Sequence, residues 1–214
     1  MKILKPNTKA FTALELMIVI LTVAVMVALL LPPRPKQRNT RIHCLNNLKN
    51  VGIGFRLWAD DHGGKFPMEI STNAGGTRGL PGDPGTIWQF QILAKVLGDN
   101  ARLLACPADG QRSAATTFLT NFDNTHVSYF IGLDANETLT NAFLAGDRNL
   151  QNGGTPRSGI LPFTPAQPIG WGKDIHKEQG NVLFVDGRVA RLDSRQVRSS
   201  LADTGLATNR LAFP

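Results

Sequence analysis

Cysteine and charge are scarce in this chain. Of its 214 residues, two are cysteine and 18% are charged. Cys44 and Cys106 belong to no C-x-x-C pair, so a zinc ribbon is not indicated. If the folded body lies outside the cytoplasm, the two can form one disulfide. Two separate thiols are the other interpretation, and the sequence does not decide between them because it does not fix their separation.

Common enzyme fingerprints are missing as well. The chain contains no Ser/His/Asp nucleophile elbow, P-loop or dinucleotide-binding glycine fingerprint, so we expect that it is not an enzyme. A hydrophobic fraction of 42% supplies material for a core, which argues against disorder throughout. The length suits one domain plus an anchor, and 21 glycines with 13 prolines indicate many turns.

The net charge of +7 is unevenly distributed. Basic residues gather on the two sides of one apolar run: Lys2, Lys5 and Lys9 before it, and Arg34, Lys36, Arg38 and Arg41 after it. We interpret this excess as the flanks of a membrane segment, where it meets anionic lipid headgroups. Nucleic acid is therefore not expected as a partner.

The apolar run covers residues 11–31 and reads FTALELMIVILTVAVMVALLL. As a helix it would span roughly 31 Å, the thickness of a bilayer's hydrocarbon core. Pro32 and Pro33 predict that the helix stops or bends there. A cleaved secretory signal would have a shorter apolar core, followed by a small-x-small cleavage site. We therefore predict a transmembrane helix over 11–31.

Glu15 lies inside this run, where a carboxylate costs about 3 kcal/mol. A plain anchor has no use for such a group, so we expect a partner for it. Cleavage between Ala10 and Phe11 would create an α-amino group at Phe11. That amine could pair with Glu15 of a neighbouring helix at a subunit contact.

The segment from Lys9 to Glu15, KAFTALE, resembles the processing site of type IV prepilins and type II secretion pseudopilins. In that family a prepilin peptidase removes a short basic leader before a Phe, which is then N-methylated, and an acid stands at the fifth mature position. The resemblance implies cleavage between Ala10 and Phe11, N-methylation of Phe11 and an assembly role for Glu15. Pro32 falls where the family often has a proline. The residue before the cut is usually Gly, and Ala10 keeps a small side chain, so we expect cutting to proceed.

Three further stretches resemble one pseudopilin-like group: CLNNLK at 44–49, LWADDH at 57–62, and His176 followed by nine residues and Asp186-Gly187. The resemblance implies an α+β, pilin-like fold in which a long N-terminal transmembrane helix packs on a small antiparallel β-sheet. The expected organisation has four parts: a cleaved basic leader at 1–10, a transmembrane and assembly helix at 11–31, an amphipathic continuation at 32–62, and a globular α+β body at 63–214.

The amphipathic continuation has apolar residues at spacings of three and four: Ile42, Leu45, Leu48, Val51, Phe55, and Trp58 or Ala59. In the body, residues 86–97 predict a short helix, 127–133 a strand and 149–168 an exposed loop.

The H-x9-DG region predicts a hairpin within 176–192. Asp186-Gly187 between two apolar runs is typical of a two-residue type I′ turn. That turn would pair Phe184 with Val189 and Leu183 with Ala190. Since both faces of the hairpin are largely apolar, we expect it inside a sheet that is covered on both sides.

Two groups of residues allow a metal interpretation. His176 with Asp186, and Asp174 nearby, could form an acid–base pair or bind a metal. We favour turn geometry for Asp186 and a backbone hydrogen bond for His176. The second group is Asp60, Asp61 and His62, whose oxygens suit calcium but complete no known ligand set, so we favour a solvated helix end. No cofactor is expected, with calcium as the one alternative.

The expected function is that of a structural subunit, a pseudopilin or pilin-like protein that assembles into a type II secretion or type IV pilus-like fibre. Its expected partners are the prepilin peptidase/methyltransferase, other pilin-like subunits and the inner membrane. The resemblance implies a single pass, with the leader cytoplasmic and the body periplasmic. Two alternatives stay open: a membrane-anchored surface binding module that uses prepilin processing only for export, and a metal-dependent enzyme centred on His176.

Overall fold

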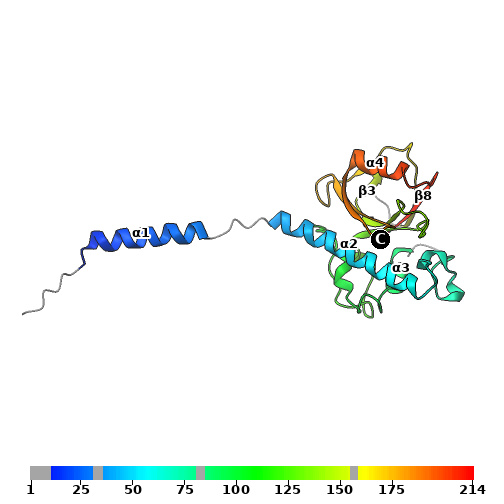
Figure 1. Ribbon diagram of the computed structural model, residues 1–214, viewed down its shortest axis with the longest axis horizontal. Coiled ribbons are helices and arrows are strands. Elements are labelled where there is room, and N and C mark those ends of the chain that lie inside the picture. Colours follow the sequence, from blue (N-terminus) through cyan, green and yellow to red (C-terminus); the bar gives the residue numbers. More distant parts are fainter. Residues whose placement is uncertain (1–10, 31–35, 81–84, 155–158) are drawn as a thin grey trace, which may run out of the picture. The chain divides into compact units, whose positions relative to one another are not determined.

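The computed structural model describes residues 11–30, 36–80, 85–154 and 159–214 (Figure 1). The chain forms two compact units, divided between Lys36 and Gln37, and each unit is described by itself. The predicted leader with Ala10, and the predicted bend at Pro32, lie outside the described residues.

The first unit contains helix α1, Ala13–Leu30, which is 18 residues long and carries a single charged residue, Glu15. Its described side chains are exposed, Leu14 and Leu21 by more than two thirds. Within the described ranges, no helix is long and apolar enough to cross a membrane.

Helix α2, Lys36–Asp60, belongs to the second unit from Gln37 onward and packs one face on the body. The buried residues recur at spacings of three and four: Cys44, Leu48, Val51, Phe55, Trp58 and Ala59. The prediction of this stripe was correct from Leu48 onward but wrong at Ile42, which is 50% exposed, because the buried face begins at Cys44. Gly52 lets the helix approach the sheet closely, since a Cβ there would lie 2.8 Å from a methyl of Leu183.

The body is built on a six-stranded sheet in the order β4-β8-β1-β2-β6-β7, with every neighbouring pair antiparallel. Its strands are β1 Tyr129–Gly132, β2 Phe143–Asp147, β4 Gly159–Phe163, β6 Gln179–Phe184, β7 Val189–Asp193 and β8 Asn209–Phe213. Strands β3, Leu150–Asn152, and β5, Ile169–Trp171, form a separate antiparallel pair. An α+β body with an antiparallel sheet is therefore confirmed.

Side chains alternate between two buried layers, one on each face of this sheet. Tyr129 and Ile131 of β1 pack in the layer that contains the buried face of α2, whereas Phe130 packs in the other. The second layer is closed by helix α4, Ser194–Ala202, together with β3 and β5. Figure 1 shows α2 and α4 on opposite sides of the sheet. The expectation that β6 is covered on both sides is confirmed, while β7 is an edge strand.

The hairpin between β6 and β7 exists, but its predicted register was wrong by one residue. Leu183 pairs with Val189, and the loop has three residues, because Gly187 N–H donates to the carbonyl of Phe184 and Phe184 N–H donates to Arg188. Only Gly187 has a positive φ, 85°. The loop is thus a three-residue turn that ends in a glycine with left-handed backbone. An Asp-Gly pair is suited to this loop as well as to a two-residue turn.

The remaining elements are short. Helix α3, Gly85–Gln91, ends six residues before the predicted Leu97. The predicted loop over 149–168 was wrong in part, since it contains both β3 and β4, and Leu150 and Phe163 are fully buried. Four single turns of 3-10 helix complete the described structure: Pro67–Glu69, Thr72–Ala74, Ala101–Leu104 and Asn124–His126.

Candidate functional site

The start of α1 is closed by a reciprocal hydrogen-bond pair. The backbone N–H and the hydroxyl of Thr12 each donate to Glu15 Oε2 at 2.9 Å, and the Glu15 N–H donates to the Thr12 hydroxyl at 3.3 Å. This is the capping-box arrangement, in which two otherwise orphaned backbone donors at a helix start are satisfied. Sequence analysis missed this local partner of Glu15, although Thr-x-x-Glu before an apolar run indicates it.

A polar row crosses the sheet on its α2 face. Tyr129 of β1 pairs with Asp147 of β2, and Asn181 of β6 pairs with Arg191 of β7. Asn181 joins the two pairs, because its backbone N–H and its side-chain amide donate to Asp147 Oδ2 at 2.7 and 3.0 Å. Asp147 is completely buried. Four adjacent strands therefore present polar groups at one level of an otherwise apolar layer.

His176 reaches this row from the loop between β5 and β6. The loop backbone is unusual, since His176, Lys177 and Glu178 all have left-handed φ values of 57°, 54° and 60°. Each such residue costs roughly 1–2 kcal/mol relative to ordinary backbone. Buried Asn149 holds the loop in place, because its amide donates at 2.9 Å to the carbonyls of Gly172 and Ile175.

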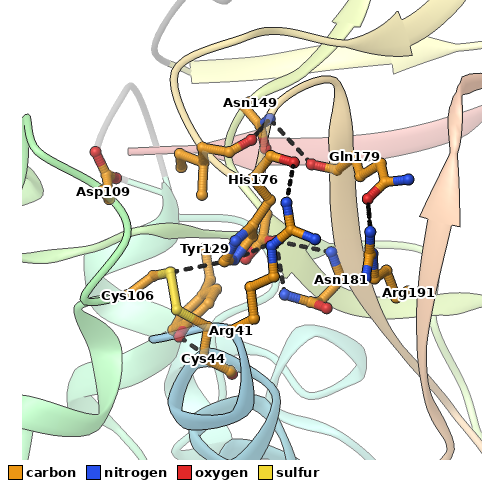
Figure 2. Close-up of polar contacts among 12 residues, drawn as sticks. Arg41, Cys44, Cys106, Asp109, Tyr129, Asn149, His176, Gln179, Asn181 and Arg191 are labelled. Atoms are coloured by element: carbon orange, nitrogen blue, oxygen red, sulfur yellow. Dashed lines mark hydrogen bonds and ion pairs between the residues drawn. A yellow bond between two sulfur atoms is a disulfide. The ribbon is translucent and has the colours of Figure 1, made fainter. Parts of the chain in front are cut away.

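The imidazole of His176 lies beside the disulfide (Figure 2) and also beside Asp147. Its Nε2 lies 3.4 Å from Cys106 Sγ and 3.6 Å from Asp147 Oδ2. Cys106 forms the disulfide with Cys44 of α2, so the pairing that the sequence left open is present. His176 Nδ1 and Asp147 Oδ1 are buried and have no hydrogen-bond partner in the part of the chain that the structure describes.

Arg41 of α2 completes the enclosure. Its guanidinium donates at 3.2 Å to the backbone carbonyl of His176 (Figure 2). The predicted hydrogen bond from the His176 ring to a loop backbone is not observed among the described residues, because Nε2 faces Cys106 and Asp147 and Nδ1 has no partner there.

Burial shifts the pKa values of Asp147 and His176 in opposite directions. Desolvation raises the pKa of Asp147 to about 7, although the two Asn181 hydrogen bonds act to lower it. Desolvation, reinforced by the positive charges of Arg41 and Arg191, lowers the pKa of His176 to about 4. Between these values the carboxyl is protonated and the imidazole is neutral. The pair is thus no ion pair in that range, and the neutral ring nitrogen keeps a lone pair that can bind a metal.

A buried ion pair braces the loop that carries Cys106. Arg148 donates to both carboxylate oxygens of Asp109, at 2.7 and 2.8 Å, and to Gln111 at 2.9 Å. This bidentate geometry fixes the loop against the end of β2. Sequence analysis missed Asp147, Arg148 and Asn149. Three consecutive polar residues at the end of an apolar strand were the available signal.

The other predicted metal candidates do not join this site. Asp60 and Asp61 are exposed at the end of α2, and His62 stacks on Trp58 with ring centroids 3.6 Å apart while its Nδ1 contacts the Trp58 carbonyl at 2.7 Å. Asp186 accepts the Arg188 backbone N–H at 2.8 Å, as expected for a turn residue.

One group of three suitable ligands is found in the described ranges, Cys44, Cys106 and His176. The alternative pairing of His176 with Asp186 is not observed, because His176 faces Asp147 instead.

A pocket of about 310 Å³ opens beside His176. Its lining is mainly basic: Thr40, Arg41, Ala108, Lys173, Asp174, His176 and Lys177. Comparisons of the chain with protein-family models, with curated proteins and with solved structures give no match.

Proposed function

We propose that this chain is a pilin-like structural subunit and not an enzyme. A prepilin peptidase would cut between Ala10 and Phe11, Phe11 would be N-methylated, and the N-terminal helix would assemble with other pilin-like subunits into a type II secretion or type IV pilus-like fibre. The observation that carries the proposal is Glu15, the single charge of the apolar helix α1. Its place five residues after a basic leader and a small residue matches the prepilin pattern.

The surface of α1 supports assembly through this helix. Its large apolar side chains are exposed along the described length, from Leu14 to Leu29. A surface of this kind needs lipid or other apolar helices around it. Subunits that leave the inner membrane could satisfy it by bundling their helices, with Glu15 of one subunit paired to the Phe11 amine of the next. Such a buried pair favours a specific register more than it adds stability.

The body supports an extracytoplasmic location. The disulfide between Cys44 and Cys106 is typical of proteins that fold in an oxidising compartment. The packing of α2 on an antiparallel sheet agrees with the pilin-like arrangement that the resemblance implies. We therefore propose a single-pass inner-membrane protein with a cytoplasmic leader and a periplasmic body.

The capping box gives Glu15 a second role, so the test must separate charge from capping. Glu15→Gln keeps a capping-box residue but removes the charge, whereas Thr12→Ala removes the cap and keeps the charge. If the charge sets the subunit register, Glu15→Gln and Glu15→Ala abolish co-fractionation with partner pilin-like subunits, and Thr12→Ala assembles. Losing a cap alone costs about 1 kcal/mol of helix stability. Normal assembly of Glu15→Gln would show that Glu15 only caps the helix.

The proposed cleavage and N-methylation can be tested separately from assembly. Mass spectrometry of the mature protein should find N-methyl-Phe11 at its start, and Ala10→Gly should be cut at least as fast as the natural chain. A finished product that keeps Lys2, Lys5 and Lys9 would contradict the proposal.

The basic pocket beside His176 favours one second candidate, a surface binding module for an anionic ligand that uses prepilin processing only for export. Arg41, Lys173 and Lys177 face a single acid, Asp174, in its lining. Co-purification with other pilin-like subunits distinguishes the two functions, because a binding module would be processed normally and yet be recovered without them.

A further inference from the structure

The disulfide, His176 and Asp147 together have the donor atoms of a metal centre. We propose that, when Cys44 and Cys106 are reduced, their two sulfurs bind a thiophilic metal ion such as Zn²⁺ together with His176 Nε2 and the carboxylate of Asp147. The disulfide joins α2 to the Cys106 loop, and the ion would join these two segments to the loop between β5 and β6 and to strand β2. The proposal does not depend on fibre assembly.

The two distances from His176 Nε2 already fit a tetrahedral ion, whereas the two sulfurs separate from their bond on reduction. With usual zinc bond lengths, the edges of the tetrahedron are about 3.6 Å between sulfur and nitrogen and about 3.4 Å between nitrogen and oxygen. His176 Nε2 lies 3.4 Å from Cys106 Sγ and 3.6 Å from Asp147 Oδ2. The ligand atoms of Cys44, Cys106 and His176 all lie within 4.8 Å of one another. His176 is therefore placed between the sulfurs and the carboxylate at metal-site spacing.

The unpartnered oxygen of Asp147 is the second observation. A buried acceptor without a partner costs about 1–3 kcal/mol, and an ion is one of the accepted explanations for it. Asp147 Oδ1 is such an atom, while Oδ2 is oriented by two hydrogen bonds from Asn181. Hydrogen bonds that orient a ligand are typical of the shell around a metal site.

The donor set selects the class of ion. Two thiolates and one imidazole favour Zn²⁺ or Cu⁺ over Ca²⁺ and Mg²⁺, which prefer all-oxygen ligands. Two thiolates and one carboxylate around Zn²⁺ leave one net negative charge. Arg41 and Arg191 lie close to His176 and offset that charge.

Reduction requires a dithiol reductant, which transfers two electrons and two protons to the disulfide and itself becomes a disulfide. Two thiols result, and Zn²⁺ displaces their two protons when it binds. Cys44 and Cys106 are 0% and 1% exposed, so a reductant reaches them before the body folds or after local opening. The ion would then hold α2 on the sheet in a chain whose disulfide has not yet formed.

The test uses the full chain in detergent, unfolded in urea with a reductant and refolded with Zn²⁺ or Co²⁺. We expect about one ion per reduced chain after desalting. With Co²⁺, we expect the visible bands of tetrahedral coordination and a sulfur-to-cobalt charge-transfer band. The oxidised chain and Cys44→Ser/Cys106→Ser should bind no ion.

Two variants locate the ion. Asp147→Asn should weaken Zn²⁺ binding by at least the 10- to 100-fold, roughly, that the loss of an outer-shell partner costs, and His176→Asn should weaken it further. His126→Asn is the matched control, because His126 also lies beside a carboxylate, 2.9 Å from Asp123, but belongs to no group with the two cysteines. Its loss should leave Zn²⁺ binding unchanged. Near-UV circular dichroism of each oxidised variant shows that the body still folds. Two results would overturn the proposal: a reduced chain that binds no more ion than the double serine variant, or His176→Asn binding as tightly as the natural chain.

Discussion

Asp147 and His176 should give the body two opposing pH dependences that nearly cancel. The folded pKa of Asp147 lies above its unfolded value of 3.8, so the folded state holds more protons on this group. Its stabilising contribution is complete below the unfolded pKa and is lost as the pH rises towards about 7. The folded pKa of His176 lies below its unfolded value of 6.5, so its contribution is complete above that value and is lost as the pH falls towards about 4.

The two effects are similar in size. One pKa unit corresponds to about 1.4 kcal/mol, so the shift of Asp147 is worth ~4 kcal/mol and that of His176 ~3 kcal/mol. Both groups are at least nine-tenths buried, so water screens these terms little. Between about pH 4.5 and 6.5, folding moves one proton from the imidazole to the carboxyl and releases none from the pair. The natural chain should therefore show little pH dependence from this pair in that window.

Each single variant should show the pH dependence of the free energy of unfolding that comes from the remaining group. In His176→Asn only the Asp147 term remains, so the free energy of unfolding should rise as the pH falls from about 7 to about 4, by up to ~1.4 kcal/mol per pH unit. In Asp147→Asn only the His176 term remains, and the free energy should fall over the same window. Asparagine is suitable at position 176 because it tolerates the left-handed backbone better than most residues.

Urea unfolding of the oxidised, metal-free full chain in detergent, followed by tryptophan fluorescence at several pH values, measures these slopes as differences from the natural chain. The double variant Asp147→Asn/His176→Asn is the control and should return the profile of the natural chain. Slopes of the same sign in the two single variants would refute the assignment of the proton to Asp147.

Two stability predictions test the packing around the site. Asp109→Asn leaves the buried guanidinium of Arg148 without its bidentate partner and should lower the free energy of unfolding by about 3–5 kcal/mol, whereas the exposed turn variant Asp186→Asn should change it by less than about 0.5 kcal/mol. Gly132→Ala would place a Cβ 1.8 Å from a β2 carbonyl oxygen and should destabilise the body by about 3 kcal/mol. Gly110→Ala has no atom within 4 Å of the new Cβ and is the matched control, and urea midpoints compare each pair.

Local sequence patterns predicted secondary structure correctly where the spacing of apolar or turn residues is enough to define it. The apolar stripe from Leu48 to Ala59 identified the buried face of α2, and Asp186-Gly187 identified the hairpin. The hairpin register was missed because Asp-Gly occurs in both two- and three-residue loops. A one-residue shift changes which residues of the two strands pair, and the local sequence is compatible with either register. Strand β4 was missed because glycine and proline near it resemble a loop, while its pairing with β8 depends on residues 50 positions away.

The site itself could be predicted only in part. His176 and the two cysteines were singled out, but their meeting point depends on the contact between α2, the Cys106 loop and the sheet, and no local pattern encodes such a contact. Asp147 was missed for the same reason. Its carboxyl faces the imidazole because cross-strand pairing places it beside Asn181, 34 residues later in the chain. The capping role of Glu15 was not predicted, although the local Thr-x-x-Glu pattern that begins at Thr12 indicates it.

The spacing of His176 and Asp186-Gly187 has a structural explanation that leaves the imidazole out. At one end of this segment, Arg41 donates to the His176 carbonyl at 3.2 Å, and at the other end Arg56 donates to the Val185 carbonyl at 2.9 Å. The two arginines are 15 positions apart on α2, roughly 22 Å along the helix, which is within reach of the nine-residue strand and turn between the two carbonyls. Strand β6 is thus fastened to α2 at both ends by backbone carbonyls that any residue could supply. The side chain at position 176 is not needed for this fastening, and its imidazole beside two sulfurs and a carboxyl is therefore free for the metal centre proposed above.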